Sequence, residues 1–145
     1  MSSKALLARN AIIDLLETVQ LDGEPAFAAV QGDPYGAYDK TPIVRVLPAS
    51  QDSNTAAYRT TDRTVNFNVR TTLPMKRTDE FDRLYTLTDL IIDALDQADA
   101  ADTFSGTLGT YMMTTTHGDW FEESSESGPM LTAEINVSVA YSKNN

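Results

Sequence analysis

Residues 131–141 read LTAEINVSVAY. Apolar side chains recur at every second position from Leu131 to Tyr141, and most of the positions between them are polar. A repeat of two places alternate side chains on opposite faces of a β-strand. This stretch therefore predicts a strand with one buried face and one polar face, the latter carrying Thr132, Glu134, Asn136 and Ser138.

A second stretch shows the same alternation. Residues 64–70 read TVNFNVR, in which three apolar side chains alternate with polar ones. A strand with one polar face is typical of an antiparallel sheet or of a sheet edge, because buried parallel strands are apolar on both faces. Shorter strands are expected over residues 26–31, 43–47 and 107–117.

Two segments have helical periodicity. Residues 3–20 place apolar side chains three and four positions apart, and Ser3 can cap the first turn. Thr78 can cap a second helix whose first turn contains Asp79 and Glu80, where the helix dipole favours negative charge. The expected buried stripe of this second helix consists of Phe81, Leu84, Leu87, Ile91, Ile92 and Leu95.

The expected order of elements is α-β-β-β-α-β-β. This order predicts a single α+β domain over residues 1–145, with a mostly antiparallel sheet and two helices packed on one face. Residues 49–62 are polar and show no apolar period, so they predict either a long loop or the tip of an extended hairpin. A polar, acidic loop is expected over residues 118–128, and we expect mobile loops near 48–63 and 118–130.

Composition excludes several functions. The chain has 145 residues, 21 acidic and 11 basic side chains and a formal charge of −10. A groove that wraps nucleic acid needs clustered Lys and Arg, and an anionic membrane surface attracts basic segments, so we expect neither of these partners. There is no cysteine, which excludes disulfides and thiolate chemistry. No apolar run is long enough for a secretory signal or a spanning helix.

The sequence also lacks the residue patterns of common active sites. His117 is the only histidine, and no second ligand stands at metal-binding spacing from it. A serine triad would need His117 together with a Gly-x-Ser-x-Gly turn, which is absent. The glycines at 106 and 109 are not followed by the lysine of a phosphate-binding loop. We therefore expect no catalytic residue, no metal and no cofactor.

Two segments are candidates for contact with other proteins. The first ends the polar stretch and contributes Tyr58, Arg59, Asp62 and Arg63, whose arginines could meet acidic groups on a partner. The second is the pair Trp120 and Phe121 within the acidic segment. Large aromatic side chains in such a segment either fold back on the core or anchor a partner, and the sequence leaves both alternatives open.

Taken together, four stretches resemble a known family. They are PIVRV at 42–46, VNFNVR at 65–70, DLIIDAL at 89–95 and the final alternating strand from Ala133 to Tyr141. With the short N-terminal helix, this pattern resembles the tail terminator (tail-completion, neck) proteins of tailed bacteriophages. The resemblance extends over residues 3–141 and rests on length, element order and these stretches.

The resemblance implies a structural role in the virion tail or neck, after assembly in the host cytoplasm. Members of the family form a hexameric ring on the last ring of the tail tube, stop tube polymerisation and present a surface to the head-side connector or stopper protein. The genome passes through the lumen without specific binding. An acidic wall fits such a conduit, because it repels phosphates instead of holding them.

Other functions are compatible with the same sequence. A head-side neck or stopper protein, or a minor tail protein, would have similar composition. A small ligand-binding regulatory α+β domain and an enzyme are further alternatives. A ligand-binding domain would require a concave pocket lined by apolar and aromatic groups, and this cannot be read from the sequence.

Overall fold

The computed structural model describes residues 3–32, 40–57, 60–75, 79–109, 111–125 and 128–144, with the backbone alone at 50–57, 60–62, 79, 125 and 142–144. Its elements follow in the order α1 (Lys4–Glu17), β1 (Gln20–Leu21), β2 (Glu24–Pro25), β3 (Ala29–Gln31), β4 (Ile43–Ala57), β5 (Thr60–Pro74), α2 (Asp79–Ala100), α3 (Ser105–Leu108), β6 (Tyr111–Ser125) and β7 (Gly128–Asn144). The predicted single α+β domain is confirmed.

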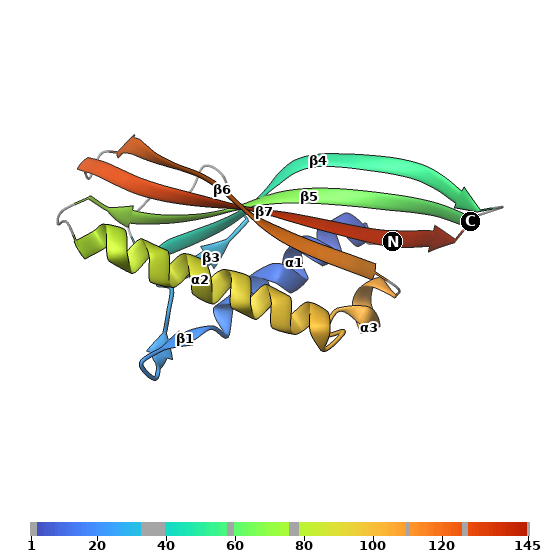
Figure 1. The fold of residues 1–145 in the computed structure, drawn as a ribbon, viewed down its shortest axis with the longest axis horizontal. Coiled ribbons are helices and arrows are strands. Elements are labelled where there is room, and N and C mark those ends of the chain that lie inside the picture. Colours follow the sequence, from blue (N-terminus) through green and yellow to red (C-terminus); the bar gives the residue numbers. More distant parts are fainter. Residues whose placement is uncertain are drawn as a thin grey trace.

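Five strands form the main sheet in the order β3-β4-β5-β7-β6. The three residues of β3 run parallel to β4, and every other neighbouring pair is antiparallel. The long strands twist strongly and cross near their middle in Figure 1. A coiled sheet of this kind follows from the right-handed twist of each strand.

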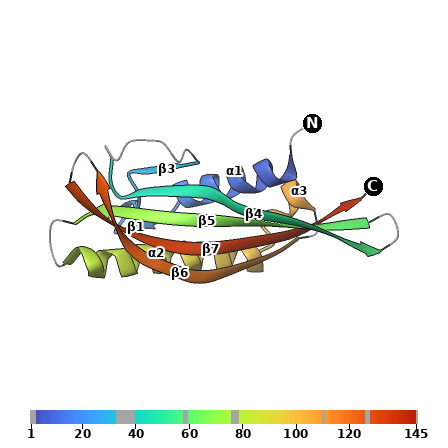
Figure 2. The same ribbon diagram turned by 90° about the horizontal axis from the view of Figure 1, so that it is seen from above.

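Both long helices cover one face of the sheet (Figure 1). Seen from above, α1 lies along β3 and β4, whereas α2 lies along β7 and β6 (Figure 2). The core between the layers consists of Ala8, Ile12 and Leu16 of α1, Leu84, Leu87, Ile91 and Leu95 of α2, and the helix-facing side chains of the strands, among them Val44, Val46, Phe67, Val69, Ile135 and Val137. The alternation of residues 64–70 and 131–141 is thereby confirmed.

The predicted stripe of α2 is wrong at its first member. Phe81 remains 40% exposed, although Leu84, one turn later, is fully buried. Within α2, the residues from Phe81 to Arg83 are exposed, and burial begins at Leu84. An exposed aromatic residue is thus left at the start of α2.

The polar segment 49–62 is an extended hairpin and not a long loop, as far as the structure describes it. Strands β4 and β5 pair from Ile43–Thr72 to Ala57–Thr60, with irregularities after Pro48 and after Thr55. This hairpin projects beyond the helices in Figure 1. The hairpin is therefore formed by strand pairing over a stretch whose sequence shows no apolar period.

The expected loop over 118–128 is also wrong. Strand β6 continues to Ser125 and pairs with β7, with one irregularity between His117 and Trp120. The strand expected over 107–117 begins only at Tyr111, because the residues before it form the short helix α3. An irregular insertion explains why the alternation of β6 could not be followed through the sequence.

A two-stranded hairpin follows α1 and was not predicted. Strands β1 and β2 pair antiparallel around Asp22 and Gly23, whose φ angles are 55° and 82°. Positive φ at both central residues is the requirement of the tight turn that Asp-Gly favours. Asp22 and Gly23 therefore form a hairpin turn.

Candidate functional site

The open edges of the main sheet are its most distinctive surface. Strand β6 forms one edge, and β7 is its single neighbour among the described strands. At the other edge, β3 covers β4 from Ile43 to Arg45. From Val46 to Ala57, no described strand pairs with β4 on that side. The domain thus presents two different strand edges on opposite sides.

The β6 edge lacks the usual protection at its start. Natural edge strands carry charges, prolines or bulges that prevent pairing with other chains. Residues 111–116 read YMMTTT and contain none of these, and the irregularity follows only after His117. Met112 in this stretch is 67% exposed. The edge therefore has the properties of a strand that another chain covers.

Three aromatic side chains form a patch beside β6, which we call the aromatic patch: Phe81 and Tyr85 of α2 and Trp120 of β6. The rings of Tyr85 and Trp120 are 4.4 Å apart between centroids and tilted by 44°. Phe81 lies one turn before Tyr85 on the same side of the helix. Trp120 is half-buried against the core, whereas Tyr85 is 61% exposed.

The sequence leaves open whether Trp120 and Phe121 fold back on the core or anchor a partner. In the structure, the two side chains lie on different faces of the sheet. Trp120 folds back onto α2 and the core, and its ring contacts the exposed ring of Tyr85. Phe121 is half-buried on the opposite face of the sheet, where its ring centroid lies 5.4 Å from the guanidinium carbon of Arg70. The side chains of these two consecutive residues thus lie on opposite faces of the sheet, as alternation along a strand requires.

The face of the sheet away from the helices carries a polar cluster that sequence reasoning missed. Arg70 donates from Nε to Oε2 of Glu134 at 3.1 Å. The hydroxyls of Thr72 and Thr132 lie 2.9 Å apart, and Thr132 donates to Glu123 Oε2 at 3.3 Å. Thr132 is fully buried, so the predicted polar face is not exposed to solvent at this end of the sheet.

This cluster follows from strand register. Arg70 lies opposite Glu134, and Thr72 lies opposite Thr132. Such cross-strand pairs stabilise a sheet, and the polar positions of both strands were visible in the sequence. Their register was not, and the pairs could not be assigned without it.

The other predicted contact residues are only partly described. Tyr58 and Arg59 lie outside the described residues, and of Asp62 only the backbone is described, within β5. Arg63 is half-buried, and its buried Nε makes no hydrogen bond among the described residues. Arg63 pairs with Tyr141 of β7, whereas Trp120 pairs with Ala133, so the two predicted segments lie far apart along the sheet.

A groove of about 380 Å³ runs between α1 and the free part of β4; we call it the α1–β4 groove. Its lining consists of Ala5, Leu6, Arg9, Pro48, Ala49, Val65 and Phe67. Arg9 is the charged member, and Arg63 stands two residues before Val65, on the same face of β5. The ammonium of Lys4 is directed elsewhere, because it donates to the Leu108 carbonyl at 3.2 Å. The groove is therefore apolar with basic side chains beside it.

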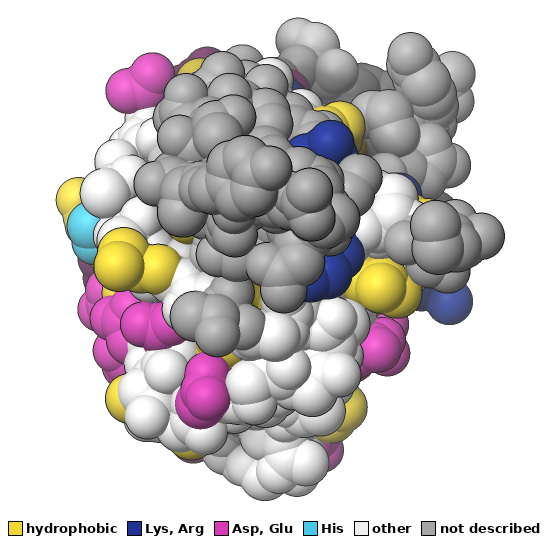
Figure 3. All heavy atoms as spheres, turned by 90° about the vertical axis from the view of Figure 1, so that its right-hand side faces the viewer, with side chains coloured by type: hydrophobic (Ala, Val, Ile, Leu, Met, Phe, Trp, Pro, Cys, Tyr) yellow, Lys and Arg dark blue, Asp and Glu magenta, His cyan; other side chains and the backbone are white. Residues whose placement is uncertain are grey.

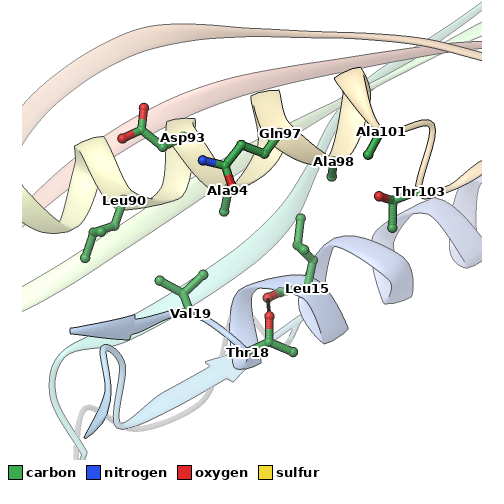
Figure 4. A pocket seen from close by; sticks show the side chains of 10 residues that line it. All are labelled: Leu15, Thr18, Val19, Leu90, Asp93, Ala94, Gln97, Ala98, Ala101 and Thr103. Atoms are coloured by element: carbon green, nitrogen blue, oxygen red, sulfur yellow. Dashed lines mark hydrogen bonds between the residues drawn. The ribbon is translucent and has the colours of Figure 1, made fainter. Parts of the chain in front are cut away.

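A second groove, of about 530 Å³, separates the two long helices (Figure 4). The small side chains of Ala94 and Ala98 of α2, and of Ala101 just after it, face Leu15 and Val19 across the groove. Thr18 lies on the same wall as Leu15 and donates from its hydroxyl to the Leu15 carbonyl at 2.6 Å. Asp93 is the one charged residue of this lining.

One ionisable side chain near the sheet has a shifted pKa. Burial raises the pKa of Tyr111, the charges of Asp102 and Asp99 raise it further, and a backbone hydrogen bond from Phe104 opposes this. The hydroxyl accepts from the Phe104 amide at 3.3 Å and donates to the Ala98 carbonyl at 3.4 Å. Tyr111 thus ties the start of β6 to the end of α2.

The described part of the chain contains no group of three or more His, Asp or Glu side chains arranged to hold a metal. His117 is exposed on β6. None of the described helices is long and apolar enough to cross a membrane. No protein-family model matches the sequence, and no curated protein matches it.

Proposed function

We propose that this protein is a structural virion protein that closes into a ring at the head-proximal end of a phage tail tube. The ring ends tube polymerisation and joins the tail to the head-side connector, and the genome passes through its lumen. In this role the subunit acts by shape and contact, without catalysis or a cofactor, in the tail or neck of the particle.

The open β6 edge carries this proposal. Six successive residues, 111–116, form an edge without charge, proline or glycine, and the exposed Met112 stands among them. The opposite edge, β4 from Val46 onwards, is a different surface. Two unlike edges on one rigid domain favour head-to-tail contacts, and such contacts close into a ring when the rotation between copies allows it.

The net charge supports the passage of DNA. A formal charge of −10 per chain is repeated in every copy around a ring. Such a wall repels the phosphate backbone, whereas clustered Lys and Arg would bind it and release counterions. We expect weak binding of duplex DNA at moderate salt in a filter-binding or anisotropy assay, and tight binding would remove this part of the proposal.

Electron microscopy of the purified protein, alone and with polymerising tail tube protein, tests the proposal. We expect annular particles and tubes that are shortened and capped at one end. Thr114→Lys places a charge on the exposed β6 edge and should reduce both effects, since edge charges oppose strand pairing. Gln20→Lys adds the same charge on an exposed residue of β1, outside the main sheet, and should leave both unchanged. Unaltered tube lengths with the unmodified protein would contradict the proposal.

A related position in the particle is a close alternative. A head-side neck or stopper protein, or a minor tail protein, could use the same edges in a ring. Such a protein would associate with connector rings or mature tails and would not limit the length of growing tubes. The tube assay above therefore separates these positions from tail termination.

The groove between the helices favours a second candidate function, that of a small ligand-binding regulatory domain. Its volume of about 530 Å³ falls in the range of small-molecule sites, and its walls combine apolar with polar side chains. A thermal-shift screen of small metabolites tests this function. A ligand that raises the melting temperature, and fails to do so when Ala94→Trp fills the groove, would favour it.

A further inference from the structure

We propose that the acidic α2–β6 edge of one copy docks against the α1–β4 groove of the next, so that β6 lies antiparallel to the free part of β4. The inference rests on the proposed ring and specifies which surfaces close it. The occupant of the groove is thus a second copy of this chain.

Charge is distributed unevenly between the two edges. The sequence of α2 contains seven acidic residues and one arginine, and that of β6 contains three acidic residues and neither Lys nor Arg. On the other side, Arg9 lines the α1–β4 groove and Arg63 stands two residues before Val65 of its lining, which contains no acidic residue. In Figure 3, Asp and Glu gather on the side that carries the histidine of β6, whereas the visible Lys and Arg lie toward the other side, where some acidic side chains are also seen. Complementary charges of this kind orient partners and reject the wrong pairing.

Apolar surface is present on both partners. Phe81, Tyr85 and Met112 are exposed on the α2–β6 side. Met112 lies level with the free part of β4, whereas Trp120 lies level with Val44, which β3 covers. The α1–β4 groove is lined by apolar side chains, including Leu6, which is 43% exposed. Burial of apolar area provides most of the affinity of such contacts, while the surrounding charges fix their orientation.

Strand direction is compatible with this contact. Strands β4 and β7 run one way, and β5 and β6 run the other. When a second domain continues the sheet in the same orientation, its β4 is antiparallel to β6 of the first. Such pairing satisfies the open backbone groups of both edges and keeps the helices of both copies on one face.

The symmetric alternatives are less favourable. A two-fold contact between two β6 edges would bring the acidic α2 helices of both copies close to each other. A two-fold contact between two α1–β4 grooves would oppose basic side chains. Like charges across an interface destabilise it, so the unlike edges are the better partners.

Cysteine cross-linking tests this contact without background, because the chain has no cysteine. Asn66 pairs with Ser50 of β4 and with Ser138 of β7, and Ser138 pairs with Thr114 of β6. The exposed residues Ala49 and Thr114 therefore lie at similar heights on opposite edges. We would prepare Ala49→Cys, Thr114→Cys and the double variant, and treat each with a bismaleimide spanning about 10 Å, roughly twice the strand spacing.

The expected cross-linked products differ between the head-to-tail contact and the two-fold contacts. The double variant should give a ladder of multimers, a mixture of the two single variants should give dimers, and each single variant alone should remain monomeric on a denaturing gel. Dimers from Thr114→Cys alone or from Ala49→Cys alone would overturn the inference, because they report a two-fold contact. Absence of cross-linking in the double variant would also overturn it.

A charge substitution provides an independent test. Arg9→Glu should weaken the association of the double variant, because it places an acid in the groove that receives an acidic edge. Lys40→Glu, the same reversal of charge at an exposed lysine outside α2, β6 and the groove lining, should not weaken it. Equal loss in both variants, or no loss in either, would contradict the charge complementarity.

Failure of this inference can be told apart from failure of the proposed function. Tube capping is measured with the unmodified protein and does not depend on which edges meet. Capped tubes without the cross-linked ladder would overturn the contact and leave the function standing. A ladder without capped tubes would support the contact and contradict the function.

Discussion

Truncation of Trp120 measures how firmly the far part of β6 is held against α2. Full burial of a tryptophan makes its replacement by alanine cost about 3–5 kcal/mol. Trp120 is only half-buried, and part of its contact is the ring of the exposed Tyr85 at 4.4 Å. We therefore expect Trp120→Ala to lower the free energy of unfolding by about 2–4 kcal/mol. Tyr85→Ala should lower it by about 1 kcal/mol.

Urea denaturation of both single variants and the double variant completes a double-mutant cycle. A tilted aromatic pair is worth about 0.5–1.5 kcal/mol beyond its buried area, and the coupling between Trp120 and Tyr85 should fall in this range. Circular dichroism of each variant checks that the fold is kept.

The substitutions of Tyr85 and Trp120 should differ in their effects on assembly and on stability. Tyr85→Ala should reduce annular particles although it changes stability little, because the exposed ring belongs to the proposed contact surface. A cost below about 1 kcal/mol for Trp120→Ala, with no coupling to Tyr85, would refute the packing of β6 on α2. Normal assembly of Tyr85→Ala would remove the aromatic patch from the contact.

Three further perturbations follow from particular contacts. Gly118→Ala should cost about 1–3 kcal/mol, because its Cβ would lie 2.9 Å from the Glu134 carbonyl oxygen, whereas Gly106→Ala meets nothing within 4 Å and should be neutral or slightly stabilising. Thr132→Val should cost about 1–3 kcal/mol, since it leaves the buried Thr72 hydroxyl without its partner, and the double change to valine should cost less than the single one. Tyr111→Phe should cost about 1 kcal/mol at neutral pH and should lessen the loss of stability above about pH 10.

The sign of the pH effect follows from the raised pKa of Tyr111. In the unfolded chain this tyrosine loses its proton near pH 10, while the folded protein still retains it. Its contribution to stability is therefore complete below about pH 10 and is lost as the pH rises toward the folded-state value. Identical high-pH unfolding of Tyr111→Phe and the unmodified protein would contradict this assignment. Equal stability of the two glycine variants, or a double valine variant less stable than the single one, would contradict the corresponding contacts.

Alternation and helical spacing were sufficient to predict the core. The apolar positions of residues 131–141 and most of the stripe of α2 lie where the sequence places them, because each faces the interior of one layered domain. The turn at Asp22 and Gly23 was also accessible from the sequence, since this dipeptide favours tight hairpins.

Other parts of the fold depend on context that one sequence does not contain. The polar segment 49–62 has no apolar alternation, and its pairing continues strands whose other ends lie over the core. The irregularity between His117 and Trp120 interrupts the alternation of β6. Thr132 is polar yet fully buried, because its partner Thr72 stands opposite it in a register that only the paired sheet defines.

The candidate site was predictable in part. Trp120 stood out as a large aromatic residue among acids, but its partner Tyr85 lies on a helix far away in sequence. The charge difference between the edges appears only when α2 is placed beside β6 and α1 beside β4. The sequence thus indicated a protein built for contacts, and the arrangement of its elements identifies the surfaces that could make them.

Electron microscopy of the purified chain, extended to class averages in the end-on view, tests the central claim most directly. We predict a closed annulus of identical subunits with six-fold symmetry and an open lumen, formed alone or on the ends of tail tubes. Protein that remains monomeric at every concentration, and that leaves added tail tubes uncapped, would contradict the account.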